Sequence, residues 1–202
     1  MSDIVSPDVE AYSESLTSPA PDDLQALADA TRASLECPQM LTGPIEGRLL
    51  QTLAWVARPR LVVELGTYSG YSAQFMARAL PEGGRLISCE LDPERAEFAR
   101  ARMDDPRIEI RVGPALESLD AIDGPIDLAF VDADKGGYTD YYEALVPKIS
   151  ERGLIVADNT LHGGGALEGD LMDAFNRHVL EDPRTVCELL PIRVGVTLIR
   201  LA

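Results

Sequence analysis

Acidic and amide side chains follow two apolar runs of the chain. The stretch LAFVDADKGGY ends an apolar run in Asp132, Asp134 and Lys135, and IVADN ends another in Asp158 and Asn159. Carboxylate and amide oxygens are the ligands that hard cations such as Mg²⁺ prefer, and a lysine beside such a site is suited to act as a general base. Asp and Asn are also frequent turn and cap residues after strands. The pattern leaves both readings open, and the combination of these residues favours a cation site.

A second group of residues surrounds a glycine turn in LVVELGTYSGYSAQF. Gly66 and Gly70 allow a sharp turn and a close approach between backbone and ligand. Glu90, at the end of LISCE, lies 20 residues beyond Gly70, where an acid can bind the ribose hydroxyls of a ligand lying over the turn. The alternative is that the glycines only make a tight connection and that Glu90 caps the following helix together with Asp92 and Pro93, since short glycine motifs often match by chance.

The spacing of the turn indicates which ligand it suits. The NAD fingerprint is G-x-G-x-x-G, whereas this chain has G-x-x-x-G with Glu64 two residues before Gly66. A carboxylate in the turn would repel a pyrophosphate but attract a cation. S-adenosylmethionine carries an ammonium, a sulfonium and no phosphate, so the turn favours this cofactor over a dinucleotide.

These residues need a sheet to bring them together, and the chain has the pattern of one. Short apolar runs at 61–65, 85–89, 107–112, 126–131 and 153–157 alternate with helical patterns that begin near residues 71, 93, 115 and 138. This alternation predicts an α/β fold with a Rossmann-like, doubly wound, mostly parallel sheet and helices on both faces. Ligands bind at the carboxyl ends of the strands in such sheets, so the glycine turn, Asp132 and Asp158 are expected at one crevice.

The two ends of the chain follow other patterns. TVCELLP and VGVTLIRLA are β-rich runs that we expect to form an antiparallel C-terminal hairpin at the sheet edge. Apolar residues at helical spacing from Leu24 to Leu35, and again from Pro44, predict two helices near the N-terminus. Residues 1–20 are rich in Ser, Pro and acid, so we expect a flexible or packing arm there, followed by a single domain over residues 21–202.

Composition limits the partners and the compartment. The 202 residues carry a net charge of −16, which argues against nucleic acid or an anionic membrane as a partner. The start of the chain lacks the basic and apolar regions of a signal peptide, and no run reaches the length of a membrane helix. Cys37, Cys89 and Cys187 are far apart and offer no zinc-ligand spacing. We therefore expect a cytoplasmic protein.

Four motifs resemble those of a known enzyme family when they are taken in order. VVELGTYSGYSA, ISCELDPERAEFAR, LAFVDADKGGY and IVADNTLHGG resemble the motifs of class I metal-dependent O-methyltransferases, the catechol and caffeoyl-CoA type, from about Met40 to the C-terminus. The resemblance implies methyl transfer from S-adenosylmethionine to a hydroxyl of a catechol-like aromatic diol. It implies a divalent metal, Mg²⁺, Mn²⁺ or Ca²⁺, which oxygen ligands do not separate sharply. Relatives are often dimers, so a homodimer is expected.

The resemblance also implies roles for individual positions. Asp132, Asp158 and Asn159 match the metal ligands, and Lys135 matches the proposed catalytic base. The positions that match cofactor contacts are Thr42, Glu64, Gly66, Tyr68, Gly70, Ser72, Glu90, Ala115 and Asp132.

The chain departs from the family pattern in two places. After Asn159 the segment TLHGGGALEGD is short, contains three glycines in a row and carries His162, which is a loop residue, a substrate contact or a second base. Val194 stands where an acid is common. Both changes affect the expected acceptor rather than the expected reaction. The alternative functions are a metal-independent methyltransferase, a dinucleotide-binding oxidoreductase and a binding module without turnover.

Overall fold

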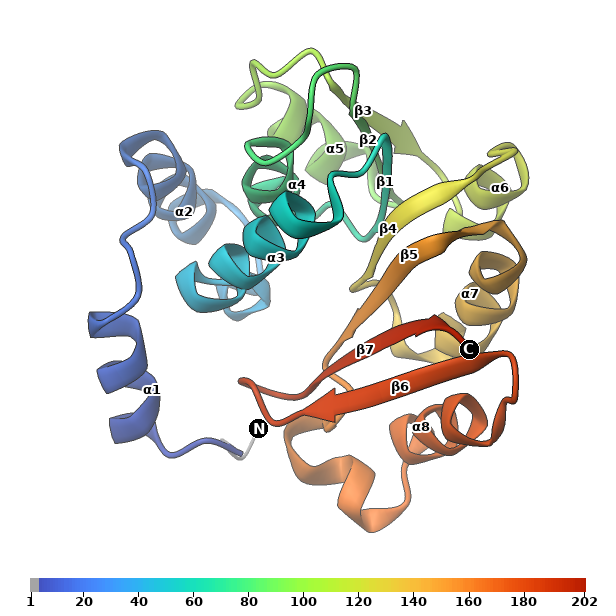
Figure 1. Cartoon of the computed structure of the whole chain (residues 1–202). Coiled ribbons are helices and arrows are strands. Elements are labelled where there is room, and N and C mark those ends of the chain that lie inside the picture. The colour runs from blue at the N-terminus through green and yellow to red at the C-terminus, as the bar shows by residue number, and fades with distance from the viewer. Residues whose placement is uncertain (1–3) are drawn as a thin grey trace.

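The computed structural model describes residues 4–202 and has a seven-stranded sheet at its centre (Figure 1). The strand order is β3-β2-β1-β4-β5-β7-β6. The strands are β1 (Leu61–Leu65), β2 (Arg85–Glu90), β3 (Ile108–Val112), β4 (Ile126–Val131), β5 (Ile149–Asp158), β6 (Thr185–Leu190) and β7 (Val196–Leu201). β1 to β5 are parallel, and β7 lies antiparallel between β5 and β6. The predicted parallel sheet with an antiparallel C-terminal hairpin is confirmed.

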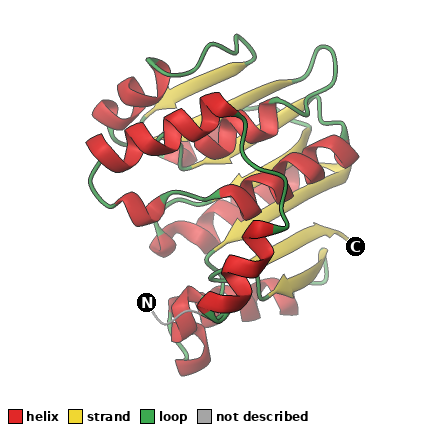
Figure 2. Cartoon of the chain, turned by 90° about the vertical axis from the view of Figure 1, so that its left-hand side faces the viewer, coloured by secondary structure: helices red, strands yellow, loops and turns green. Residues whose placement is uncertain are grey.

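Helices cover both faces of the sheet (Figure 2). On one face, Leu50 and Met76 are fully buried against Val62 and Phe130 of the strands. On the other face, Tyr142 belongs to a second buried cluster with strand residues. The helices are α1 (Pro7–Ser15), α2 (Asp22–Ser34), α3 (Pro44–Ala57), α4 (Tyr71–Ala77), α5 (Pro93–Arg100), α6 (Ala115–Asp120), α7 (Tyr138–Leu145) and α8 (Leu171–Glu181). Short 3₁₀ segments are η1 (Pro38–Met40), η2 (Lys135–Gly137), η3 (Val146–Lys148) and η4 (His162–Glu168). In residues 4–202, no helix has the length and apolar character needed to cross a membrane.

Two segments differ from the sequence pattern. β5 begins at Ile149, four residues before the predicted strand, because its first part carries the exposed, polar Glu151 and Arg152 and has no apolar run to mark it. The N-terminal segment 1–20, of which residues 1–3 lie outside the described part, contains α1. No residue of α1 is buried, so the helix lies on the surface of the molecule.

The glycine turn after β1 lies against the end of β4. The N–H of Asp132 donates to the carbonyl of Leu65 at 2.8 Å, which extends the pairing of the two strands to the first residue of the DADK motif. Gly66 has φ +102°, and a Cβ there would clash with the carbonyl oxygen of Asp132. Only glycine suits this conformation and this spacing, so the turn and the acidic motif are held side by side.

Candidate active site

A cavity of about 980 Å³ opens along the carboxyl edge of the sheet. Ligand pockets are typically about 300–1,000 Å³, so the cavity has room for a cofactor and a small acceptor together. The wall near β1, β2 and α6 includes Gly66, Tyr68, Glu90 and Ala115. The wall near β4, β5 and β7 includes Asp132, Lys135, Asp158, Asn159, His162, Arg193 and Val194.

The structure brings most of the predicted site residues to this one cavity. Those on its wall are Gly66, Tyr68, Glu90, Ala115, Asp132, Lys135, Asp158 and Asn159. Thr42, Glu64, Gly70 and Ser72 are buried and lie outside the lining. A cofactor role for these four residues, and the individual roles of those on the wall, stay predictions.

Glu90 is fixed at the cavity wall, near the ends of β1 and β2, by backbone donors. The N–H of Tyr68 donates to Glu90 Oε2 at 2.7 Å, and the N–H of Asp92 donates to Oε1 at 3.0 Å. Asp92, rather than Glu90, caps α5 by accepting the N–H groups of Glu94 and Arg95. Of the predicted cap, Asp92 and the first-turn proline Pro93 are confirmed, whereas Glu90 binds the N–H of Asp92 before the helix and its carboxylate is held at the cavity wall.

Glu64 is fully buried between two hydroxyl groups. Ser72 Oγ donates to Glu64 Oε1 at 2.5 Å, and Ser88 Oγ donates to Oε2. Burial raises the pKa of Glu64 to about 8, although the two serine hydrogen bonds act in the opposite direction. A cationic group that approached this carboxyl would favour its ionised form.

The buried Glu64 makes the stability of the cofactor-free protein depend on pH. Its folded-state pKa of about 8 exceeds the ordinary value of 4.5, so the folded state binds a proton more tightly than the unfolded chain does. The contribution of Glu64 to the free energy of unfolding is then highest below about pH 4.5 and falls as pH rises to about 8, by on the order of a few kcal/mol. Denaturant unfolding between pH 5 and 9 should show this fall, and Glu64→Gln should make it shallower, with the rest of the fall coming from Glu46 and Asp132, whose pKa values burial raises to about 7.

A matched control is Glu82→Gln, which changes an exposed glutamate in the turn before β2. This variant should keep the pH dependence of the natural sequence. An equally steep fall in Glu64→Gln would show that Glu64 is ionised in the free protein.

Three carboxyl groups gather at the other end of the cavity. Burial and the neighbouring Asp158 together raise the pKa of Asp132 to about 7, although Lys135 acts in the opposite direction. Burial and Glu46 raise the pKa of Asp158 well above its ordinary value. Burial also raises the pKa of Glu46 to about 7 against the effect of Arg193, and Glu46 Oε1 has no hydrogen-bond partner among the described residues. A cluster of buried acids with an unpaired oxygen favours a bound cation.

The carboxylate and amide oxygens at this end of the cavity are the kind of ligand that a hard divalent ion prefers. The side chains, as they lie, are not arranged around a common point for such an ion. Asn159 donates to both oxygens of Asp158, from its backbone N–H at 2.6 Å and from Nδ2 at 2.5 Å. Within residues 4–202, no group of three His, Cys, Asp or Glu side chains has the geometry of a metal site. The predicted set takes an amide as its third ligand, and Asn159 would have to turn its amide to present an oxygen.

Lys135 lies beside the acids and is held from two sides. Its Nζ donates to Asp132 Oδ1 at 3.2 Å and to the hydroxyl of Tyr138 at 2.8 Å. The Tyr138 hydroxyl is in turn 3.1 Å from the carbonyl oxygens of Val131 and Asp158. The amine is therefore positioned at the ends of both β4 and β5, on the wall of the cavity.

Two further residues of this end were missed by the sequence analysis. Arg193 Nη1 forms an ion pair with Glu46 Oε2 at 2.7 Å and donates to the carbonyl of Thr42. Arg193 lies in the connection before β7 with φ 49°, and Glu46 is a fully buried residue of the first turn of α3. Neither residue belongs to a recognisable motif, so the sequence holds no signal that joins them.

Solved structures show which class of protein has this fold and cavity. An SAH-bound methyltransferase from Podospora anserina, PaMTH1, matches with a TM-score of 0.90 and 28% identity over 96% of this chain and 94% of its own. An O-methyltransferase from Bacillus cereus in complex with SAH matches with a TM-score of 0.88 and 26% identity over 96% and 97%. The chain therefore has the fold of Rossmann-like S-adenosylmethionine-dependent O-methyltransferases.

The family model described as O-methyltransferase matches residues 14–202, and the chain belongs to this family. A catechol O-methyltransferase from Niastella koreensis is 38% identical over 73% of this chain and 70% of its own length. A catechol O-methyltransferase from Mycobacterium tuberculosis is 37% identical over 83% and 79%. A caffeoyl-CoA O-methyltransferase from Mesembryanthemum crystallinum is 31% identical over 89% and 80%. The protein is thus an enzyme of the S-adenosylmethionine-dependent O-methyltransferase class.

Proposed function

We propose that the protein transfers a methyl group from S-adenosylmethionine to one hydroxyl of a catechol-like aromatic diol, in a reaction that needs a divalent metal ion. The observation that carries this proposal is the position of Lys135, 3.2 Å from Asp132 in the same cavity as Glu90. Val5, Met40 and Val194 give the wall apolar surface that suits an aromatic ring. The names of the catechol O-methyltransferase relatives support the choice of acceptor.

Residues at the two ends of the cavity would have different roles, cofactor binding at one end and metal binding at the other. Glu90 would bind the ribose hydroxyls, and Asp132, Asp158 and Asn159 would hold the ion. S-adenosylmethionine supplies the electrophilic methyl group, and a divalent ion supplies Lewis acidity and a template for adjacent oxygens. Lys135 Nζ would accept the proton of the acceptor hydroxyl. Most of the rate gain then comes from the positions in which the cavity holds the acceptor oxygen and the methyl group.

A metal-independent methyltransferase is the second candidate, and one observation favours it. Both carboxylate oxygens of Asp158 are already bonded by Asn159, so the pair is self-satisfied without an ion. The unpaired Glu46 Oε1 and the neighbouring acids favour the metal.

Methyl transfer from labelled S-adenosylmethionine to a small panel tests the proposal. Catechol, caffeic acid, dihydroxybenzoate and a monophenol are each assayed with Mg²⁺ and with EDTA. We expect metal-dependent product from the diols and none from the monophenol, because a single oxygen chelates poorly. Product that is insensitive to EDTA would contradict the metal requirement and support the second candidate.

We also propose that the enzyme is a cytoplasmic homodimer. α1 exposes Val9 and Tyr12, Leu16 is exposed directly after it, and the end of α3 exposes Trp55 and Val56, which is apolar surface of the kind that interfaces bury. Cys37, Cys89 and Cys187 are unpaired, as expected in a reducing compartment. Light scattering coupled to size exclusion should give twice the chain mass of 21.9 kDa, and a monomer mass would overturn the dimer.

A further inference from the structure

The glycine-rich segment after Asn159 carries a histidine at the cavity wall. His162 is the first residue of η4 and has φ 47°. Its backbone N–H donates to the carbonyl of Asn159 at 2.9 Å, and its side chain, 39% exposed, lines the cavity. The imidazole therefore lies at the same end of the cavity as Lys135, where the acceptor is expected.

Asp170 holds one face of this imidazole in place. Asp170 Oδ2 lies 2.5 Å from His162 Nδ1. The other oxygen, Oδ1, caps α8 by accepting the N–H groups of Met172 at 2.8 Å and Asp173 at 3.2 Å. Because the helix cap fixes the carboxylate, the carboxylate in turn fixes the orientation of the ring.

The absence of a side chain at Gly165 leaves room for the contact between His162 and Asp170. A Cβ on Gly165 would clash with Asp170 Oδ2 and would lie 3.3 Å from His162 Nδ1. A larger residue at this position would push the carboxylate off the ring. The contact that orients His162 therefore depends on a glycine of the triple-glycine loop.

The pairing determines which ring nitrogen has a free lone pair in the neutral imidazole. An ionised Asp170 can only accept a hydrogen bond, so in that form Nδ1 carries the proton and Nε2 is the acceptor. Among the described residues, Nδ1 is the ring atom of His162 that forms a hydrogen bond. Nε2 is left to accept a bond from a ligand that enters the cavity.

We propose that His162 is an acceptor-binding residue whose Nε2 accepts a hydrogen bond from a hydroxyl of the aromatic acceptor. Asp170 is the positioning residue that sets the tautomer of His162. This inference rests on the proposed function and adds a recognition group to it, while Lys135 keeps the role of base. The class of ligand that His162 selects is a phenol with a free hydroxyl proton.

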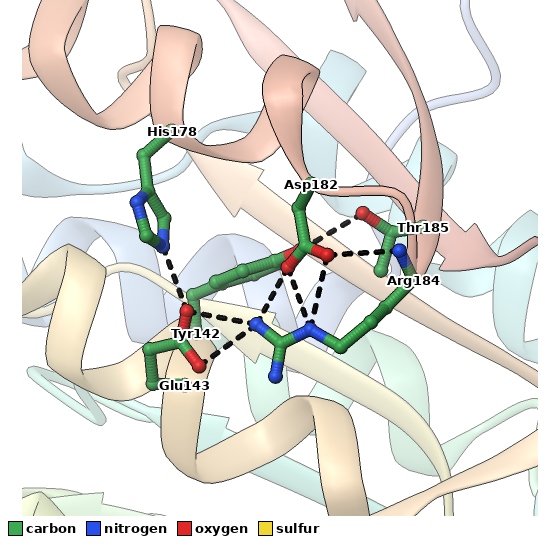
Figure 3. Close-up of polar contacts among 6 residues, drawn as sticks. All are labelled: Tyr142, Glu143, His178, Asp182, Arg184 and Thr185. Atoms are coloured by element: carbon green, nitrogen blue, oxygen red, sulfur yellow. Dashed lines mark hydrogen bonds and ion pairs between the residues drawn. The ribbon is translucent and has the colours of Figure 1, made fainter.

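The chain offers a matched control because it has two histidines. Figure 3 shows the other one, His178 of α8, which bonds Glu143 Oε1 through Nε2 at 2.7 Å. Arg184 joins Glu143 to Asp182 in the same surface network. His178 also has an acidic partner but does not line the cavity, so His178→Gln should leave acceptor recognition unchanged.

Steady-state kinetics with varied diol and saturating cofactor test the proposal. His162→Ala removes the acceptor atom, and Asp170→Asn keeps a good helix cap but turns Oδ2 into a donor, which forces the proton onto Nε2. Both variants should lower kcat/KM for the diol about three- to tenfold, the value of one hydrogen bond, mainly through KM. His162→Gln, whose Oε1 can accept the same bond, should recover part of the loss.

The affinity for SAH, measured by calorimetry, separates recognition from a packing defect. It should stay within about twofold of the wild-type value in every variant, since one lost acceptor contact does not reach the cofactor. Wild-type acceptor KM in both His162→Ala and Asp170→Asn would overturn this inference alone. Parallel losses of SAH affinity and diol kcat/KM in both would also overturn it, as a purely structural role. Absence of turnover on every diol in the wild-type protein would overturn the proposed function and this inference with it.

Discussion

Replacing Asp158 with alanine is expected to lower the rate of methyl transfer at least about 100-fold while leaving SAH affinity nearly unchanged. Replacing a residue that only orients a metal ligand lowers metal affinity or activity about 10- to 100-fold. Replacing a ligand itself should therefore lower the activity at least as much. Asp158 is 2% exposed at the end of β5, next to Asn159 and across the cavity from Glu90. Initial rates with saturating Mg²⁺, together with calorimetric titration of SAH, measure both quantities.

The control for this variant is an aspartate at the opposite end of the sheet. Asp127, near the start of β4, accepts the N–H groups of Arg60 at 2.8 Å and Leu61 at 3.2 Å. Asp127→Ala should lower the melting temperature and leave kcat intact, because its contacts lie far along β4 from the cavity edge. If Asp158→Ala kept near wild-type activity with Mg²⁺ present, Asp158 would not be a metal ligand in this enzyme.

Replacing Lys135 with methionine is expected to lower kcat by about 100- to 10,000-fold, the usual contribution of a general base. Methionine keeps the length of the side chain and removes the amine, so packing against Tyr138 should persist. The loss should appear in kcat rather than in acceptor KM, because the amine acts on the proton that leaves during the reaction. Single-turnover rates with preformed enzyme–cofactor complex measure this step directly.

The other lysine of the chain provides the control. Lys148 Nζ donates to the carbonyl groups of Leu119 and Ile122 and lies outside the cavity. Lys148→Met should cost stability, because two buried carbonyls lose their donor, and should leave the single-turnover rate unchanged. A Lys135→Met enzyme with an unchanged single-turnover rate would assign the proton to another group, such as bulk water.

The fold and the position of the site could be predicted from local patterns. Strand runs such as 61–65 and 126–131 are marked by apolar residues that every buried parallel strand needs. Gly66 is marked as a turn residue because it directly follows such a run, and the structure adds its close approach to Asp132. Parallel strands share one carboxyl edge, so residues that directly follow them must meet. This rule places Asp132, Asp158 and Glu90 in one cavity without any knowledge of side-chain contacts.

Site residues that do not lie at the carboxyl end of a parallel strand could not be predicted in this way. Glu46 and Arg193 are 147 positions apart, and they meet because α3 packs on β4 and β5 and the connection before β7 reaches its first turn. His162 gains its orientation from Asp170 only because η4 folds back onto the cap of α8. The charge states also depend on the fold, since the pKa values of Glu46, Glu64 and Asp132 are raised mainly by burial. The sequence next to a strand is enough to predict which residues lie at its carboxyl end. Ion pairs between distant residues and the raised pKa values of buried carboxyl groups arise only when the chain is packed, because packing brings the partners together and removes water from the carboxyl groups.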